Sequence, residues 1–86
     1  MAEVVIYTTA FCPFCSQAKR LLSSKDVAFT EIDVTMNSSK RREMTNMAGS
    51  TSVPQIFVDG DHIGDCDEIH RLEQKGALDH MLGLAS

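Results

Sequence analysis

Two cysteines, Cys12 and Cys15, stand two residues apart where a strand pattern changes into a helical pattern. The preceding residues 3–9 are mostly β-branched or aromatic and contain no glycine or proline, which predicts a short buried strand. In residues 13–24, apolar side chains recur at helical spacing, which predicts an amphipathic helix. Those side chains are Phe14, Ala18, Leu21 and Leu22. Pro13 suits the first turn of that helix, where its missing N–H is no loss. We therefore expect the cysteine pair at the N-terminus of a helix that directly follows a strand.

The rest of the chain continues the alternation of strand and helix patterns. Further strands are predicted at residues 27–34, 54–60 and 61–64, and further helices at residues 37–49 and 65–76, before a final short helix marked by Leu78, Met81 and Leu82. The last two strands are expected to form a hairpin with its turn at Asp59-Gly60. The order β-α-β-α-β-β-α(-α) predicts an α/β fold in one domain, residues 1–86. Its mixed four-stranded sheet would be flanked by helices.

Apolar positions in the later helices predict which faces turn inward. In the second helix these positions are Met44, Met47 and Ala48, and in the third they are Ile69 and Leu72. Asn37 or Ser38 can cap the second helix. Asp65 and Glu68 have the spacing of a capping box, so we expect the third helix to begin directly after Asp65.

Composition limits the classes of function that are open to the chain. Of its 86 residues, 43% are apolar and 23% are charged, with a net charge of −4, which is typical of a globular protein. The negative charge argues against broad binding to nucleic acid or anionic membranes. No apolar run approaches the ~20 residues of a membrane span. The beginning, MAEVVIYTT, lacks the basic start and apolar run of a signal peptide, which predicts a cytoplasmic location.

The number and spacing of the cysteines favour a redox pair over other uses. A secreted disulfide scaffold of this size would usually carry four or more cysteines in even number, and this chain has three. In a reducing compartment, a close pair is more often catalytic or metal-binding than structural. A zinc site needs about four ligands, but only Cys66 and three scattered histidines remain besides the pair. We therefore expect no metal and no purely structural disulfide.

The position of the two cysteines predicts different roles for them. Unpaired N–H groups and the helix dipole at the helix N-terminus stabilise the thiolate of Cys12. Cysteine pKa values in such settings and in C-x-x-C motifs fall to roughly 3.5–7.5. Cys15, one turn inside the helix, gains much less. We therefore expect Cys12 to attack a disulfide and Cys15 to resolve the mixed disulfide that forms.

A second stretch, TSVPQIF at residues 51–57, supports the redox interpretation. A Val53-Pro54 bond at a strand start suits a cis peptide, which would leave the backbone N–H and C=O of Val53 open to a peptide-like substrate near Cys12. An ordinary trans proline at the start of a strand is equally compatible with the sequence.

Three separated motifs, C-P-F-C, T-S-V-P-Q-I-F and G-D-C-D-E, resemble those of the glutaredoxins in order and spacing, most of all the short bacterial dithiol type. The similarity covers essentially the full length of the chain. It implies a thioredoxin fold with cis-Pro54. It also implies an enzyme that uses glutathione as co-substrate to reduce protein disulfides and glutathione–protein mixed disulfides. Its partners would be disulfide-containing proteins such as ribonucleotide reductase, and it would act as a monomer.

The resemblance also implies roles for individual residues. Cys12 would be the nucleophile that carries the glutathione adduct, and Cys15 the resolving thiol. The residues implied for glutathione binding are Phe14, Thr51, Val53, Pro54, Cys66 and Asp67, with Arg41 as a further candidate. Val53 would pair its backbone with the cysteine of glutathione. The helix start at Cys66 and Asp67 would hold the γ-glutamyl end, its carboxylate at the helix N-terminus and its ammonium at the Asp67 side chain.

Two positions depart from the family pattern. Thr9 stands three residues before the first cysteine, where the family usually has a lysine, and Asp65 replaces the second glycine of the usual Gly-Gly. Both changes suggest weaker glutathione binding or a different partner. The basic residues Lys40, Arg41 and Arg42 could supply the missing positive charge, or could simply form a solvated helix face.

Two other functions fit part of the sequence. One is a redoxin that receives electrons from an NADPH-dependent flavoprotein reductase, against which the helix start at Cys66 and Asp67 argues. The other is a carrier of an iron–sulfur cluster held between two subunits by Cys12 and glutathione. Pro13 argues against this carrier, because cluster-binding relatives commonly have a small residue there.

Overall fold

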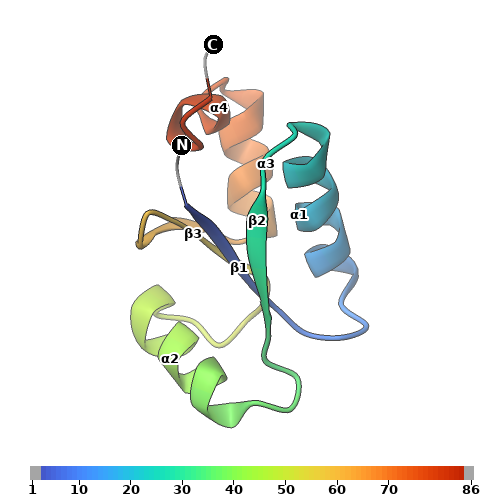
Figure 1. Cartoon of the computed structure of the whole chain (residues 1–86), viewed down its shortest axis with the longest axis vertical. Helices are drawn as coiled ribbons and strands as arrows, with labels where there is room; N and C mark the ends of the chain where they lie inside the picture. Colours follow the sequence, from blue (N-terminus) through green and yellow to red (C-terminus); the bar gives the residue numbers. More distant parts are fainter. Residues whose placement is uncertain (1–2, 85–86) are drawn as a thin grey trace.

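The computed structural model describes residues 3–84, and its elements follow the predicted order. The strands are β1 (Val4–Thr8), β2 (Phe29–Asp33), β3 (Gln55–Val58) and β4 (Asp61–Gly64) (Figure 1). The helices are α1 (Pro13–Ser24), α2 (Ser38–Ala48), α3 (Cys66–Gln74) and α4 (Leu78–Met81). Strand β2 begins later than predicted because the N–H of Val27 donates to the carbonyl of Leu22, which keeps Val27 in the turn after α1.

The four strands form one mixed sheet in the order β2-β1-β3-β4. Strand β1 pairs parallel with β2 and antiparallel with β3, and β3 pairs antiparallel with β4. Tyr7, near the end of β1, lies opposite Gln55 at the start of β3. The residues after β1 and the residues before β3 therefore meet at the same edge of the sheet. This confirms the predicted fold class and brings Cys12, the residue before α1, near the Val53-Pro54 turn.

Alternation along the strands supplies an apolar surface to each face of the sheet. On one face, Ile6 and Ile56 are fully buried with apolar side chains of α1, α3 and α4. On the other face, Tyr7 and Phe57 make an edge-to-face contact at 5.5 Å between ring centroids and pack against Met44 of α2. The sheet is thus covered on both faces, and Figure 1 shows α2 standing apart from α1 and α3. No helix in residues 3–84 is both long and apolar enough to cross a membrane.

Two apolar residues lie differently from the predicted helix faces. Met47 is 47% exposed, while Met44 is fully buried, because α2 covers only a small patch of the sheet and buries a narrow stripe. Phe14 is 56% exposed, because the buried stripe of α1 runs through other positions. That stripe consists of Cys15, Ala18 and Leu22. The prediction of Met47 as a core residue was therefore wrong.

Side-chain caps define where α2 and α3 begin, and a glycine allows the tight connection from β4 to α3. Asn37 caps α2 by accepting from the N–H of Lys40 at 3.0 Å, and Asp65 caps α3 by accepting from the N–H of Glu68 at 2.9 Å. Gly64, at φ 139°, has no substitute, since a Cβ there would lie 2.4 Å from the Cβ of Glu68. Helix α3 can therefore begin directly after β4, at the edge of the sheet.

Candidate active site

Cys12 is the residue that caps the N-terminus of α1. Its sulfur accepts a hydrogen bond from the backbone N–H of Cys15 at 3.3 Å, and Pro13 is the first residue of the helix. Because Pro13 has no N–H to donate, the first backbone donors that face Cys12 come from the residues after it. The sequence thus builds a sulfur that sits against the positive end of a helix.

The surroundings of Cys12 favour its thiolate. Burial raises the pKa of Cys12, but hydrogen bonds from Cys15, from the backbone of Phe14 and from the hydroxyl of Thr9 outweigh burial and lower the pKa below its ordinary value. Cys12 remains partly accessible. A partly exposed thiolate is the chemical form that attacks a disulfide.

Cys15 has the opposite character. It is only 2% exposed, and burial together with the neighbouring Cys12 sulfur raises its pKa to about 12. Cys15 is therefore a protonated thiol at neutral pH and a donor to Cys12. The two sulfurs differ in access and in charge, as the position of each in the helix predicts.

The loop before β3 passes next to Cys12. The Val53-Pro54 peptide bond is cis, and the carbonyl oxygen of Val53 lies 3.9 Å from the Cys12 sulfur, where it can accept from the thiol when Cys12 is protonated. The turn places the backbone carbonyl of Val53 beside the reactive sulfur, although 41 positions separate Val53 from Cys12 in the chain.

Side chains of β3 and α2 hold this loop, and one of them, Gln55, was not singled out from the sequence. The amide nitrogen of Gln55, which is 2% exposed, donates to the carbonyl of Ser52 at 2.9 Å, and its oxygen accepts from Nε2 of His62 at 2.6 Å. Arg41 donates from Nη2 to the carbonyl of Thr51 at 2.9 Å. A polar residue in the otherwise apolar run QIFV was the one signal that could have pointed to Gln55.

A cavity of about 170 Å³ opens between this loop and the start of α3. It is lined by Phe14, Ser52, Val53, Pro54, Asp65, Cys66 and Asp67. The structure therefore brings together five of the residues implied for glutathione binding. Thr51 and Arg41 lie outside the lining, joined to each other by the hydrogen bond just described. Of the two neighbouring cations in α2, Lys40 pairs with Glu43 at 3.3 Å, and Arg42 is exposed.

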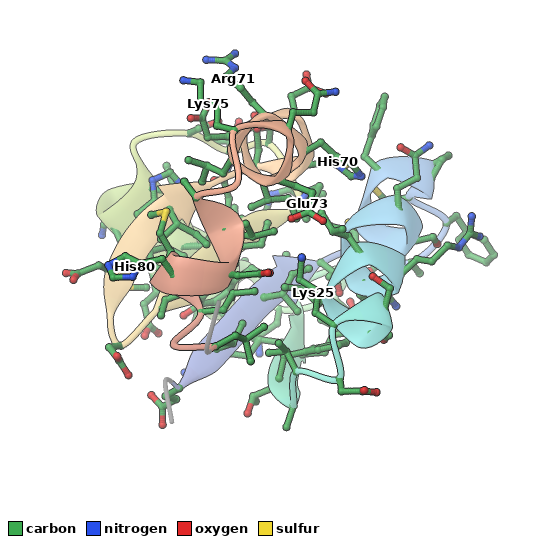
Figure 2. The ribbon with its side chains drawn as sticks, turned by 90° about the horizontal axis from the view of Figure 1, so that it is seen from above. Lys25, His70, Arg71, Glu73, Lys75 and His80 are labelled. Atoms are coloured by element: carbon green, nitrogen blue, oxygen red, sulfur yellow. The ribbon has the colours of Figure 1, made fainter. Side chains whose placement is uncertain are left out.

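Cys66 has the surroundings of an unreactive thiol. It is 4% exposed, and burial, followed by the charges of Asp67 and Asp65, raises its pKa. Nδ1 of His70 lies 3.5 Å from its sulfur but donates to the carbonyl of Cys66 at 2.7 Å, so it cannot accept the thiol proton. Figure 2 shows His70 between α3 and α1. Cys66 therefore lines the cavity as a buried thiol whose raised pKa disfavours the thiolate.

No group of three or more His, Cys, Asp or Glu side chains among residues 3–84 is arranged to hold a metal ion.

The chain resembles known proteins over most of its length. The glutaredoxin family model matches residues 4–63. Glutaredoxin 3 of Escherichia coli strain K12 is 51% identical over 82 residues, which cover 95% of this chain and 99% of that protein. A glutaredoxin of Pseudomonas aeruginosa is 50% identical over 82 residues, covering 95% of this chain and 98% of that protein.

Solved structures agree with this match. The solution structure of glutaredoxin from Brucella melitensis superposes with a TM-score of 0.85 at 43% identity, covering 95% of this chain and 89% of that chain. A buckwheat glutaredoxin–glutathione complex superposes with a TM-score of 0.88, covering 98% of this chain and 83% of that chain; at 24% identity this likeness concerns the fold. The chain belongs to the glutaredoxin family, which comprises glutathione-dependent thiol–disulfide oxidoreductases.

Proposed function

We propose that Cys12 is the nucleophile of this glutathione-dependent oxidoreductase and that Cys15 is its resolving thiol. The observation that carries the assignment is the contrast between the two sulfurs: the pKa of Cys12 is lowered, while that of Cys15 is raised to about 12. At neutral pH the accessible sulfur is therefore the better nucleophile, and the buried one keeps its proton until it is needed.

On a glutathione–protein mixed disulfide, the reaction needs only Cys12. Its thiolate attacks the glutathione sulfur, the S–S bond of the substrate breaks, and the protein leaves as a thiolate that takes a proton from water. A second glutathione thiolate then attacks the glutathione sulfur bound to Cys12. This step releases oxidised glutathione and restores the Cys12 thiolate, whose low pKa makes it a good leaving group.

On a protein disulfide, the reaction needs both cysteines. The Cys12 thiolate attacks one sulfur of the substrate, forms a mixed disulfide and releases the other sulfur as a thiolate. Cys15 then loses its proton and attacks the Cys12 sulfur, and the substrate leaves fully reduced. Two glutathione molecules reduce the Cys12–Cys15 disulfide in turn and leave as oxidised glutathione.

Glutathione would occupy the cavity beside Cys12. In this placement the cysteine of glutathione lies against the backbone of Val53 and the Pro54 turn, next to Phe14. Its γ-glutamyl carboxylate lies at the N-terminus of α3, where backbone N–H groups favour an anion, and its ammonium lies at Asp67. The lining of the cavity supports this placement. The fold shared with a glutaredoxin solved in complex with glutathione supports it as well.

The assignment of the two cysteines is tested with single serine variants. Cys12→Ser should abolish activity on every substrate, because no thiolate remains to attack. Cys15→Ser should keep glutathione-dependent turnover of a small mixed disulfide, but should lose reduction of a protein disulfide such as that of insulin. The measurement is the rate of oxidised-glutathione formation with each substrate. Equal losses in both variants on both substrates would contradict the asymmetric roles.

The placement of glutathione predicts opposite effects for two neighbouring acids. Asp67→Asn should raise the apparent glutathione KM by removing the partner of the ammonium. Asp65→Asn should lower it by roughly threefold to fivefold, because a nearby charge is removed and a partly exposed pair is worth about 1 kcal/mol or less. Asparagine can still cap α3, so the fold is preserved. Changes of the same sign in both variants would reject this orientation of glutathione.

We further propose that the protein works in the cytoplasm as a monomer, on disulfide-containing proteins such as ribonucleotide reductase. The odd number of cysteines, three, supports a reducing compartment. Family membership does not favour the flavoprotein-reduced redoxin or the iron–sulfur carrier. Turnover with glutathione reductase, compared with turnover with an NADPH-dependent redoxin reductase, tests the redoxin alternative. Visible absorbance of anaerobically purified protein tests the iron–sulfur carrier alternative.

A further inference from the structure

Two large apolar side chains stand almost entirely in solvent near the end of the sheet that carries Cys12. Phe11 is 104% exposed and Met36 is 95% exposed. Single exposed apolar residues are common on protein surfaces. These two, however, lie on neighbouring loops, and one of them directly precedes the nucleophile.

Hydrogen bonds hold the two loops together. Strands β1 and β2 are parallel, so the loop after β1 and the loop after β2 leave the sheet at the same end (Figure 1). The N–H of Ala10 donates to Oγ1 of Thr35 at 2.7 Å, which links the residue before Phe11 to the residue before Met36. The N–H of Val34 also donates to the carbonyl of Thr8 at 2.8 Å.

The backbone of Phe11 makes its exposure more unusual. Phe11 has φ 60°, in the left-handed region that residues with a Cβ rarely adopt. A ring with this exposure gains almost no packing within the chain. Neither Phe11 nor Met36 lines the cavity proposed for glutathione.

We propose that Phe11 and Met36 form an apolar rim that binds the polypeptide segment flanking the disulfide cysteine of a protein substrate. This inference rests on the proposed role of Cys12 as nucleophile. A sulfur that bonds to Cys12 brings the residues on either side of it over the residues that border Cys12, and Phe11 is one of these. Glutathione would occupy the cavity, which neither Phe11 nor Met36 lines, so the rim stays free for a polypeptide with apolar side chains next to its cysteine.

Two glutathionylated peptides of equal length test the rim. In one, leucines flank the modified cysteine, and in the other, serines do. A small mixed disulfide of glutathione and cysteamine serves as a reference that is too short to reach the rim. Wild-type protein should turn over the leucine peptide with a kcat/KM about tenfold above that of the serine peptide, as expected for burying part of a large apolar side chain.

The variants separate docking from a role in the fold. Phe11→Ala should remove most of the preference for the leucine peptide, and the further change Met36→Ala should remove the rest. Phe11→Leu should retain most of the preference, because it keeps an apolar side chain on the same backbone. Met47→Ala is the matched control: Met47 is also exposed, but it lies in the last turn of α2, about 14 Å of helix rise beyond the first residue, Ser38.

The outcomes are distinct. A preference that survives in the double variant overturns the inference while the proposed function stands. A loss of equal size on all three substrates also overturns it, because Phe11 would then support Cys12 rather than bind the peptide. Absence of wild-type turnover of the small mixed disulfide would reject the proposed function, and the inference with it.

Discussion

Thr9 stabilises the reactive sulfur in a different way from the family pattern. Where glutaredoxins usually have a lysine, this chain has a hydroxyl, which is the weakest of the hydrogen-bond donors that lower the pKa of Cys12. A lysine would act through its charge, and salt would screen that action. A hydrogen bond acts through contact, so it is far less sensitive to ionic strength. From the sequence alone, Thr9 was recognised only as the absence of the positive charge that a lysine would carry.

Replacing Thr9 tests this contact. Thr9→Val removes the donor at nearly constant shape, so the thiolate loses a stabilising hydrogen bond and the pKa of Cys12 should rise. The ultraviolet absorbance of the thiolate, followed against pH in a Cys15→Ser background, measures it. Thr9→Ser is the control and should keep the pKa of the parent. An unchanged pKa in Thr9→Val would show that the helix N-terminus alone sets the reactivity of Cys12.

Among the elements, the ends of three helices meet at Lys25. Lys25 follows α1, and its ammonium pairs with Glu73 of α3 at 2.7 Å and with Asp79 of α4 at 2.5 Å. The Lys25 side chain is only 12% exposed. Figure 2 shows Lys25 and Glu73 pointing toward each other. Hydrogen bonds to Asp79 and Glu73 raise the pKa of Lys25, so its ammonium is charged at neutral pH and both ion pairs are formed.

Removing this cation should loosen the helices without changing the chemistry at Cys12. Lys25→Met keeps most of the apolar stem but leaves two carboxylates without their cation. We expect a loss of about 1 kcal/mol in the free energy of unfolding, since both partners are partly exposed. Urea denaturation measures it, and the loss should shrink as salt rises.

Lys75→Met is the matched control. Lys75 is an exposed lysine that makes no ion pair within residues 3–84, and it points away from the molecule in Figure 2. Its replacement should change the free energy of unfolding by less than about 0.5 kcal/mol. Equal losses of unfolding free energy in the two variants would show that the ion pairs of Lys25 add no stability beyond that of an exposed lysine.

For the whole molecule, the lowered pKa of Cys12 links stability to pH. In the folded chain this pKa lies below that of the unfolded chain, about 8.5, so between the two values the unfolded state binds more protons. The free energy of unfolding then rises with pH through that interval. The contribution is fully present above the unfolded pKa and is lost as pH falls through the folded one. The raised pKa of Cys15 acts in the opposite direction, but only above the unfolded pKa.

Comparing the reduced protein with its Cys12–Cys15 disulfide form isolates this term. Other titrating groups are common to both forms. The free energy of unfolding of the reduced form minus that of the disulfide form should therefore rise with pH as the pH approaches the unfolded-state pKa of about 8.5 from below. Urea titrations at several pH values measure it, and Cys12→Ser provides a reduced protein without the thiolate. A difference that stays flat with pH would show that Cys12 does not ionise early in the folded state.

The sequence by itself determined the features that depend on neighbours along the chain. Alternation and helical spacing gave the order of strands and helices, and the C-x-x-C position gave the contrast between Cys12 and Cys15. The role of Asp65 as the N-cap of α3 could also be predicted from the sequence, because its hydrogen bond reaches only three residues along the chain. Such features follow from backbone geometry within one turn or one strand, which a local pattern records.

Only the tertiary structure decided what each side chain meets across the fold. The contacts of Gln55 with Ser52 and His62, of Arg41 with Thr51, and of Lys25 with two other helices had no signature in the sequence. Exposure of Met47 likewise depended on how little of the sheet α2 covers. The physical reason is that these outcomes depend on the distance between segments brought together by sheet pairing and helix packing. Periodicity reports which face of an element is apolar, and packing determines how much of that face is covered.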